Sequence, residues 1–491
     1  MRRSRDLLRG VVEGTAYAHN PAGIDALALL SPRAARLLDA ADGRPLRLVL
    51  ADLGAAAPGD AQGWLGEMPL LWRNGFVLSP GVAAPFLPPG ERVFNVWLHL
   101  TNACNLACPY CYIHKSKRHM SAHVVERVLA SIEATAQSGR VERIHVRYAG
   151  GEPMLRFDAM RRFHDLATQR CAAHGVRFSA AVLTNGATVP EGATQWLRDH
   201  GVSVSLSIDG IGALQDAMRP AVGGGSSFAR VVAGLDSYQT AGIRPYALVT
   251  VGDSNLDGLP ALTDFLLERG LWFRYSLVRD LQWGAELFDD RHGATDAPIG
   301  AASPPALLEG PALRRVQAVL GRCYDRIEAH VRAQGDQALA AGRRPDVGFR
   351  KGHHFCDLQP WAPIRQACGA GRSYVAIGEA GQGSPCQAAL HREGTTALHG
   401  DNLLDLASGQ TQLPHFRRHH PNPTCTRCPH RLSCAGGCPL LLHRREGHVD
   451  GRSPYCEVFK AVLPRIVHVA ALELAQQARF ARAAAVAVCG G

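Results

Sequence analysis

The sequence has 491 residues, which at the usual size of about 150 residues per domain indicates about two to four domains. Hydrophobic residues make up 46% of the chain and charged residues 20%, so the composition supports a large core and excludes an intrinsically disordered protein. Lysine and arginine total 53 against 43 acidic residues, which raises the question of a nucleic-acid partner. No apolar run reaches the roughly 18 residues of a membrane span, and no apolar stretch follows the N-terminal arginines, so we expect a cytoplasmic protein.

Residues 1–90 are predicted to form a small α+β module. Apolar residues recur at helical spacing from Ser31 to Gly43, and the segment 72–78 predicts a β-hairpin around an Asn-Gly pair. A proline- and glycine-rich stretch over 81–91 then predicts a linker.

From residue 93 the pattern changes to strands that alternate with helices. The strand candidates cover 93–100, 143–148, 177–184, 202–208, 244–251 and 271–278. One helix between them is predicted to start after an N-cap at Ser121 and to end at Gly139. Strands joined by helices predict parallel βα units over 91–280, in an open sheet or a partial barrel. Ligands bind at the carboxyl ends of the strands in such sheets.

The rest of the chain divides into a helical connector, 281–352, and a cysteine-rich unit, 353–491. From Cys356 onward glycine, proline, cysteine and histidine dominate, with little periodicity until a closing helix near 458–485. This composition is typical of a fold that is held together by metal rather than by a large apolar core.

The positions of the 14 cysteines indicate metal binding. None lies before Cys104, three lie within 104–111, and nine lie from residue 356 onward. Disulfide frameworks belong to small secreted domains, so this clustering in a long chain without an export signal predicts metal ligands. Cys171 and Cys323 stand alone in helical patterns and are predicted to be small core residues.

The first cysteine group directly follows the first strand of the alternating region. Cys104, Cys108 and Cys111 have C-x3-C-x2-C spacing, and three thiolates leave one iron of a 4Fe–4S cluster without a protein ligand. A structural zinc ion needs a closed shell of four ligands, which His114 could complete. On spacing alone, a zinc site is therefore an alternative.

This motif, which includes Tyr110, resembles the signature of the radical S-adenosylmethionine (SAM) enzymes. The resemblance implies that the three cysteines hold a 4Fe–4S cluster whose open iron is chelated by SAM. Reductive cleavage of SAM then yields a 5′-deoxyadenosyl radical that abstracts a hydrogen atom from the substrate. It also implies an α/β fold, a partial (β/α)6 radical SAM barrel.

Further motifs of this family follow at successive strand ends: YAGGEPML, LTNG and SIDG, with DAMRP after the last. A lone Gly-Gly-Glu is a weak signal, because a tight turn explains it equally well, but four motifs in order are specific. The resemblance implies that the SAM-binding residues are Tyr110, Gly150, Gly151, Glu152, Asn185, Ser207, Asp209 and Arg219.

The C-terminal cysteines, in the order C-x12-G-x4-C, C-x2-C-x5-C-x3-C and C, resemble the SPASM extension of one branch of this family. The extension implies two auxiliary 4Fe–4S clusters, and therefore three clusters in all. The implied ligands of the first are Cys368, Cys386 and Cys438, with Cys356 as the fourth. Those of the second are Cys425, Cys428, Cys434 and Cys456. From the residues alone, two zinc ribbons would also explain the segment 425–438.

Enzymes of this branch mostly modify proteins or ribosomally made peptides. The resemblance implies a maturase that installs a thioether or carbon–carbon cross-link in a peptide or protein subunit, with a low-potential electron donor such as flavodoxin or ferredoxin. Residues 1–90 are similar to the winged-helix module with which such maturases hold a leader peptide as an added strand. A simple capping domain is the alternative for this module.

The sequence also allows two alternative functions. Anaerobic sulfatase maturases, which form formylglycine, have an aspartate at the position of Gln387, and an amide cannot accept the proton. A multi-cluster electron carrier or a zinc-binding interaction protein has no need of the glycine and acidic motifs at the strand ends. We expect no nucleic-acid partner, because no arginine-rich block is interleaved with aromatic residues, and no membrane partner.

Overall fold

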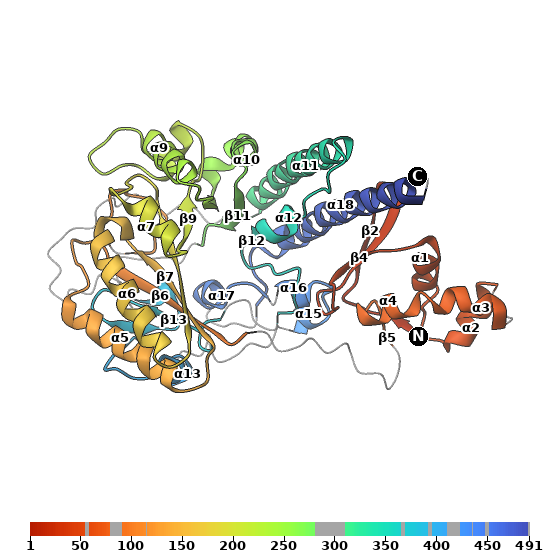
Figure 1. Ribbon diagram of the computed structural model, residues 1–491, viewed down its shortest axis with the longest axis horizontal. Coiled ribbons are helices and arrows are strands. Elements are labelled where there is room, and N and C mark those ends of the chain that lie inside the picture. The colour runs from red at the N-terminus through yellow and green to blue at the C-terminus, as the bar shows by residue number, and fades with distance from the viewer. Residues whose placement is uncertain are drawn as a thin grey trace.

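A ten-stranded, mostly parallel sheet dominates the computed structural model of the protein (Figure 1). The structure describes residues 1–54, 58–78, 91–113, 115–279, 310–364, 369–390, 395–409, 423–434, 436–446 and 451–489. Six neighbouring parallel strands follow chain order: β6 (Val93–Thr101), β7 (Arg143–Gly150), β8 (Arg177–Thr184), β9 (Ser203–Ser207), β10 (Tyr246–Val251) and β11 (Trp272–Leu277). They agree with the six predicted strands to within two residues at each end.

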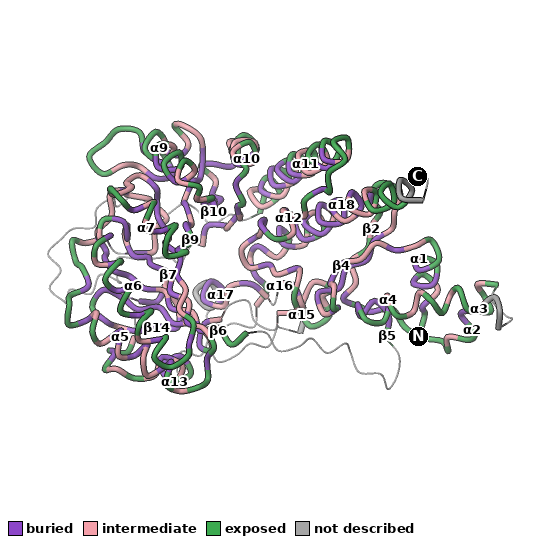
Figure 2. Tube along the Cα trace, viewed as in Figure 1, coloured by how far each residue is buried: buried purple, intermediate pink, exposed green. Residues whose placement is uncertain are grey.

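Helices connect these strands and cover the outside of the sheet (Figure 2). They are α5 (Ala122–Gln137), α6 (Phe157–Ala172), α7 (Ala193–Asp199), α8 (Ala213–Met218), α9 (Ser227–Thr240) and α10 (Leu259–Glu268), with short 3-10 helices η1 (Pro153–Arg156) and η2 (Asp253–Gly258). The first begins as predicted, because the Ser121 hydroxyl accepts a hydrogen bond from the backbone N–H of Val124 (3.3 Å). It ends before Gly139, whose φ of 64° suits the residue after a helix.

The sheet is wrapped into a partial barrel. One cavity is lined by side chains from each of the six parallel strands, including Trp97, Arg147, Leu183, Ser205, Tyr246 and Arg274. Side chains stand perpendicular to a sheet, so strands up to five places apart share a cavity only where the sheet curves around it. The predicted parallel α/β fold is therefore confirmed.

The cysteine-rich segment adds strands to both edges of this sheet. β12 (His354–Phe355) pairs in parallel with β11, and β13 (Tyr374–Ile377) pairs in parallel with β6. Two antiparallel strands, β14 (Gln382–Ser384) and β15 (Thr396–Ala397), extend the second edge. The short helices of this segment are η5 (Gln387–Ala389), α13 (Leu403–Gly409), α15 (Pro423–Thr426), α16 (Arg431–Cys434) and α17 (Pro439–Glu446).

Two long helices pack side by side beyond β11 and β12 (Figure 1). They are α11 (Pro311–Ala340), in the predicted connector, and the closing helix α18 (Cys456–Cys489); the short helix α12 (Gly348–Gly352) lies between them in sequence. Both contribute to an apolar core that is continuous with β10 and β11. Within the described ranges, no helix combines the length and the apolar character that a membrane span requires.

The N-terminal residues form a three-stranded antiparallel sheet and four helices with a small core of their own. The elements are β1 (Arg2–Arg3), β2 (Leu8–Val12), β3 (Thr15–His19), β4 (Leu27–Leu29), α1 (Pro32–Asp39), α2 (Leu46–Asp52), α3 (Pro58–Leu65), α4 (Met68–Arg73) and β5 (Val77–Leu78). We call residues 1–78 the N-terminal module. The predicted linker over 81–91 lies almost wholly outside the described residues, and the predicted domain limits at 90, 280 and 352 stay predictions.

The predicted hairpin over 72–78 is wrong. The residues before Asn74 form α4, and β5 pairs with β1 at the chain start. Gly75 has a φ of 60°, and its N–H donates to the carbonyl of Trp72 (2.9 Å). An Asn-Gly pair satisfies the carbonyl groups at the end of a helix as readily as it forms a hairpin turn, and here it does the former.

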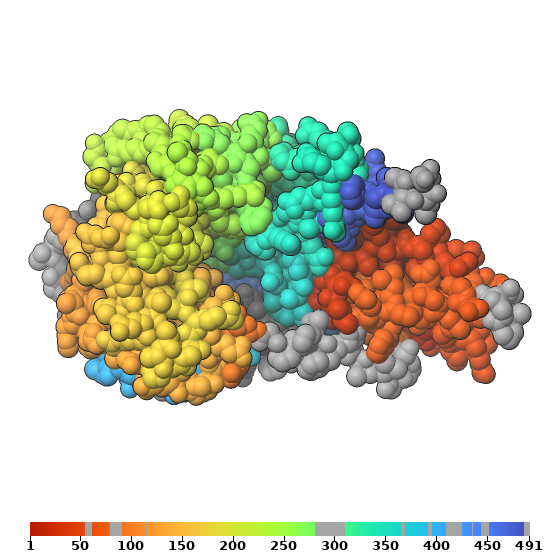
Figure 3. Space-filling view, in the orientation of Figure 1, coloured from red at the N-terminus to blue at the C-terminus, as the bar shows by residue number. Residues whose placement is uncertain are grey.

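The N-terminal module packs against the end of the chain. Val12, Tyr17 and Leu27 share the apolar core to which α18 contributes. Asp6, which is buried, forms an ion pair with Arg431 of α16 (Arg431 Nη2 to Asp6 Oδ2, 2.6 Å). Burial raises the pKa of Asp6 even though the charge of Arg431 opposes it. The module protrudes beside α18, at the end of the molecule opposite the barrel helices α5 and α6 (Figure 3).

Asp6→Ala should destabilise the protein by about 2–3 kcal/mol, because it leaves the Arg431 guanidinium partly buried without its counter-charge. Asp42→Ala, which removes the exposed partner of Arg44, is the matched control and should leave the melting temperature unchanged. The double variant Asp6→Leu/Arg431→Met should recover most of the loss, since no charge is then left unpaired. Thermal and urea unfolding measure all three; equal effects of the two single variants would contradict the expectation.

Candidate active site

A cavity of about 840 Å³ lies inside the curved sheet and reaches the carboxyl ends of its strands. Its wall combines residues from the barrel with residues from the cysteine-rich segment. The cysteines that line it are Cys104, Cys108, Cys111, Cys356, Cys386 and Cys438. Two cysteine groups that are far apart in the sequence therefore face one space.

Hydrogen bonds between residues of the same loop hold the segment after β6 in place. The Thr101 hydroxyl accepts a bond from the N–H of Ala103 (3.0 Å), and the Lys115 ammonium donates to the carbonyl of Leu106 (2.8 Å). The N–H of Leu106 in turn donates to Cys104 Sγ (3.4 Å). An N–H that points at sulfur stabilises the thiolate form, which is the form that binds metal.

Two glycines at the end of β7 let the backbone of this strand touch the cysteine loop. The N–H of Gly151 donates to the carbonyl of Thr101 (2.7 Å), and the N–H of Glu152 donates to that of Ala103 (2.8 Å). A Cβ atom on Gly150 would lie 2.1 Å from Thr101 O, and one on Gly151 would lie 2.0 Å from Ala103 O. The glycines are therefore required for this contact, a role that the sequence motif alone did not indicate.

Glu152 fastens the end of β7 to the end of β8. Its carboxylate is fully buried and accepts hydrogen bonds from the N–H of Asn185 (2.7 Å), the Thr184 hydroxyl (2.8 Å) and the N–H of Met154 (3.0 Å). Burial raises the pKa of Glu152 to about 7 against the opposing effect of these donors. The side-chain amide of Asn185 reaches back to the cysteine loop and lies 3.7 Å from Cys104 Sγ.

Asp209 plays the corresponding part beyond β9. It is fully buried and accepts hydrogen bonds from Arg219 Nε (2.7 Å), the N–H of Thr250 (2.7 Å) and the Tyr110 hydroxyl. Burial alone would lower the pKa of Arg219, but the charge of Asp209 raises it well above its ordinary value. The guanidinium stacks over the Tyr110 ring and lies 4.0 Å from Cys108 Sγ. Asp209 thus positions a cation and an aromatic ring next to the first cysteine group.

The predicted SAM contacts divide into wall residues and residues behind the wall. Those on the cavity wall are Tyr110, Gly150, Gly151, Asn185, Ser207 and Arg219. Glu152 and Asp209 do not line the cavity, and their carboxylate oxygens are already occupied by the donors described above. The geometry therefore favours positioning roles for these two carboxylates over direct contact with a ligand.

The first cysteine group has the surroundings that a metal cluster requires. Burial raises the pKa of Cys104 to about 12, and it also raises that of Cys108, so without a metal both are neutral thiols. The positive charges of Lys115 and Arg219 oppose this effect and would compensate the negative charge of a thiolate cluster. This role of Lys115 was not predicted from the sequence. A cation so close in sequence to a cysteine group could have indicated it.

Cys356 and Cys438 both lie near the ion pair between Arg279 and Asp357. Arg279 Nη2 donates to Asp357 Oδ1 (2.6 Å) and to Cys356 Sγ (3.3 Å). The charges of Asp357, Cys356 and Cys438 together raise the pKa of Arg279 well above its ordinary value. Cys368, which was predicted to join this group, lies outside the described residues, as does His114.

Cys386 lies beside Gln387 and close to the first cysteine group. The Gln387 side-chain carbonyl accepts a hydrogen bond from the Tyr374 hydroxyl (2.6 Å). Burial raises the pKa of Tyr112, and the negative charges of both Cys111 and Cys386 raise it further, so this ring lies near both sulfurs. One aromatic side chain thus connects the barrel cysteines with those of the C-terminal segment.

The remaining cysteines gather outside the cavity. Burial and the charges of Cys456 and Cys428 raise the pKa of Cys425, and Cys434 is affected by Cys456 and Cys425. Arg452 Nη2 donates to Cys456 Sγ (3.4 Å). In the part of the chain that the structure describes, no three metal-ligating side chains are already closed around a single ion.

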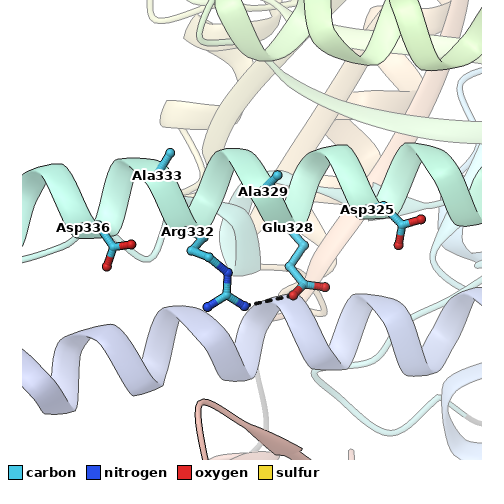
Figure 4. Close-up of a pocket in the computed structure, with 6 residues that line it drawn as sticks. All are labelled: Asp325, Glu328, Ala329, Arg332, Ala333 and Asp336. Carbon is cyan, nitrogen blue, oxygen red and sulfur yellow. Dashed lines mark hydrogen bonds and ion pairs between the residues drawn. The ribbon is translucent and has the colours of Figure 1, made fainter.

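A groove on the surface of α11 is lined by charged residues that form ion pairs with one another or with neighbouring residues (Figure 4). Arg332 donates to Glu328 one turn away (3.0 Å), and both Asp325 and Asp336 pair with arginines of α18. These charges neutralise one another along the two helices, so the groove is a helix–helix contact lined by ion pairs.

Comparison with known proteins shows that part of this chain resembles one enzyme superfamily. The sequence profile of the Radical SAM superfamily matches residues 98–266. Mycofactocin maturase MftC of Mycobacterium ulcerans (strain Agy99) is 28% identical over 372 residues, which cover 73% of this chain and 86% of the relative. The serine-type anaerobic sulfatase-maturating enzyme of Klebsiella aerogenes is 24% identical over 346 residues, which cover 70% and 78%. The solved structure of anSMEcpe with bound AdoMet shares the fold, with a TM-score of 0.58, 14% identity and coverage of 79% of this chain and 98% of the other.

Gly151→Ala should disrupt the first cysteine group, because its Cβ would meet the Ala103 carbonyl at 2.0 Å and the loop must move away. We expect the reconstituted protein to lose about four irons per chain relative to the unaltered protein, measured as iron and sulfide content together with absorbance near roughly 400 nm. Gly321→Ala, in α11 with open space around its Cα, is the matched control and should keep full cluster content. Full iron content in Gly151→Ala would show that the loop tolerates the displacement.

Proposed function

We propose that this chain, whose residues 98–266 match the sequence profile of the Radical SAM superfamily, is a maturase that installs a thioether or carbon–carbon cross-link in a ribosomally made peptide or protein subunit. The observation that carries the proposal is one cavity shared by Cys104, Cys108 and Cys111 and by cysteines of the C-terminal segment. A substrate residue inside this space would be within reach of both groups.

The first cysteine group is the proposed catalytic centre. Cys104, Cys108 and Cys111 would hold a 4Fe–4S cluster, and together with bound SAM this cluster supplies a 5′-deoxyadenosyl radical for hydrogen abstraction. Around it, Asn185 and Arg219 are placed next to the sulfurs, at 3.7 Å from Cys104 Sγ and 4.0 Å from Cys108 Sγ. Their side chains are suited to orient a polar cofactor against the open iron.

The remaining cysteines are the proposed ligands of two auxiliary clusters. Cys356, Cys386 and Cys438 line the cavity, and Cys368 would complete their set. Cys425, Cys428, Cys434 and Cys456 lie outside the cavity and would hold the other cluster. When the substrate radical forms the cross-link, the S–H or C–H bond of the partner atom would break and release a proton and one electron, and a cluster in the cavity wall would accept the electron. A low-potential donor such as flavodoxin or ferredoxin would supply the electron that starts the cycle.

The N-terminal module is the proposed holder of the substrate. Of the ten large apolar side chains that are exposed among the described residues, six belong to this module: Val11, Ile24, Leu48, Leu65, Trp72 and Leu78. Val11 lies on β2, which pairs only with β3 in the described part of the chain, so β2 offers an edge to which a peptide strand can be added. Remote holding would favour a single reacting position, which matters because hydrogen abstraction cannot be undone.

Formylglycine formation in a sulfatase is the second candidate, because a sulfatase-maturating enzyme is among the relatives. The residue after Cys386 argues against it. Gln387 lines the cavity there, with its carbonyl oxygen bonded to Tyr374, and an amide does not act as a base. Asp357, a carboxylate on the cavity wall, is already engaged in an ion pair with Arg279 (2.6 Å).

Replacing Cys104, Cys108 and Cys111 together by alanine should abolish formation of 5′-deoxyadenosine by the dithionite-reduced protein, while about eight of about twelve irons remain. Chromatography of the nucleoside product and iron analysis measure the two effects. Cys171→Ala is the control, because Cys171 is buried in α6 and away from the cavity. Continued SAM cleavage by the triple variant would exclude this group as the catalytic centre.

Val11→Glu should strongly reduce modification of a co-expressed candidate precursor peptide, because it places a charge on the exposed edge strand. Each cross-link removes two hydrogens, about 2 Da, and tandem mass spectra should lack fragments between the joined residues. Leu166→Glu, at an exposed position of α6 outside the module, is the matched control. Deletion of residues 1–90 is unsuitable, since it would remove Val12, Tyr17 and Asp6 from their contacts with the rest of the protein.

The same experiment separates the two candidate functions. Oxidation of a serine to formylglycine also removes two hydrogens, so mass alone does not decide. An aldehyde-reactive hydrazide labels formylglycine and leaves a thioether or carbon–carbon cross-link unlabelled. Labelling of the product, or full fragmentation across the modified region, would contradict the cross-linking proposal.

A further inference from the structure

Two arginines face the cavity from strands on opposite sides of the curved sheet. Arg147 lies on β7 and Arg274 on β11, and both side chains line the cavity wall. Burial lowers the pKa of Arg147, and the nearby positive charge of Arg274 lowers it further. A buried guanidinium group beside a second one is unfavourable unless an anion lies between them.

The other cations of the wall already have partners. Lys115 donates to the carbonyl of Leu106, Arg219 pairs with Asp209, and Arg279 pairs with Asp357. These are also the cations whose charges act on the cavity cysteines. They are therefore the ones placed to compensate thiolate clusters.

The arginine pair has no such partner among the described residues. Arg147 Nη1 donates to the neutral side-chain carbonyl of Asn95 (2.9 Å). Arg274 Nε is buried without a hydrogen-bond acceptor, and the hydroxyl of Tyr246 beside it is buried without a partner as well. Neither arginine takes part in an ion pair of the described chain. Around the cavity, Arg274 Nε and the Tyr246 hydroxyl thus lack an acceptor, and the hydrogen bond of Arg147 described here goes to a neutral one.

The position of the pair separates it from the proposed cofactor contacts. Arg147 lies three residues before Gly150 along β7, which is about 10 Å deeper in the barrel at about 3.3 Å per residue. Arg274 likewise lies three residues before the end of β11 at Leu277. A ligand group bound here would therefore sit below the cysteine loop, inside the barrel, where a substrate residue would enter.

We infer that Arg147, Arg274 and Tyr246 form a binding site for a carboxylate of the polypeptide substrate, either an acidic side chain or the C-terminal carboxylate. The inference rests on the proposed function, because the anions of an unmodified polypeptide are carboxylates. Planar guanidinium groups match the two oxygens of a carboxylate with paired hydrogen bonds, and a phenol hydroxyl supplies a further donor. The site would fix the substrate close to the reacting residue, in addition to the remote holding by the N-terminal module.

The test uses the cluster-loaded full-length protein and small probes without turnover. N-acetylglutamate α-methylamide carries a side-chain carboxylate and N-acetyl-Gly-Ala a C-terminal one; the glutamine analogue and the C-terminal amide are the neutral counterparts. In titrations followed by ligand-observed NMR, at least one acid should bind about tenfold more tightly than its neutral counterpart. The acid with the larger preference identifies which kind of carboxylate the site takes.

Arg147→Met/Arg274→Met should remove this preference for acid over amide. Arg177→Met, at the exposed start of β8 and outside the cavity, is the matched control and should keep it. If the methionine variant does not load its clusters, Arg147→Lys/Arg274→Lys keeps the charge but loses the paired geometry, and it should retain only part of the preference.

Three results would overturn the inference: equal binding of acid and amide by the unaltered protein, an undiminished preference in the methionine and lysine variants, or loss of SAM binding as the only effect of the substitutions. The last result would assign the arginines to the cofactor. If the protein binds the acids but cross-links no peptide, the result supports the carboxylate site and refutes the proposed function.

Discussion

The backbone of Gly150 and Gly151 lies directly on the backbone of Thr101 and Ala103, with no space for a side chain between them. This contact joins the ends of β6 and β7, and the cysteine loop starts from it. Glu152 extends the contact to β8 through Asn185, and Asp209 holds Arg219 and Tyr110 against the other side of the loop. The geometry of the candidate centre thus depends on bare glycine backbone and on two buried carboxylates that do not themselves line the cavity.

The second constraint is the way in which the C-terminal segment closes the barrel. β12 and β13 take the two outer places next to β11 and β6, so Cys356 and Cys386 are carried to the cavity from opposite edges. A chain segment that follows the barrel in sequence thereby becomes part of its wall. Large movements of the cysteines relative to the barrel are restricted, because they would break strand pairing at an edge of the sheet.

Much of this arrangement could be predicted from the sequence. The six parallel strands are short segments rich in β-branched, aromatic and other apolar residues and are bounded by turn residues, and the cap at Ser121 has a local hydrogen-bond signature. Other features could not be predicted, because they depend on tertiary contacts. β12 has two residues, too few for a periodic pattern, and the Asn-Gly pair at 74–75 suits a helix end as well as a hairpin. Residue type alone did not reveal that Glu152 and Asp209 point away from the cavity.

The packing of the N-terminal module on α18 also has a consequence for how the chain folds. Tyr17 contacts His468 across 451 residues of sequence, and Asp6 reaches Arg431 across 425. During synthesis the sheet β2–β4 therefore emerges long before its partner helix, and its apolar face stays uncovered until α18 has been made. Contacts of such high sequence separation slow folding and lengthen the time in which chains can associate wrongly. Chaperone demand and expression yield should accordingly depend on α18, although the surface at risk belongs to β2–β4.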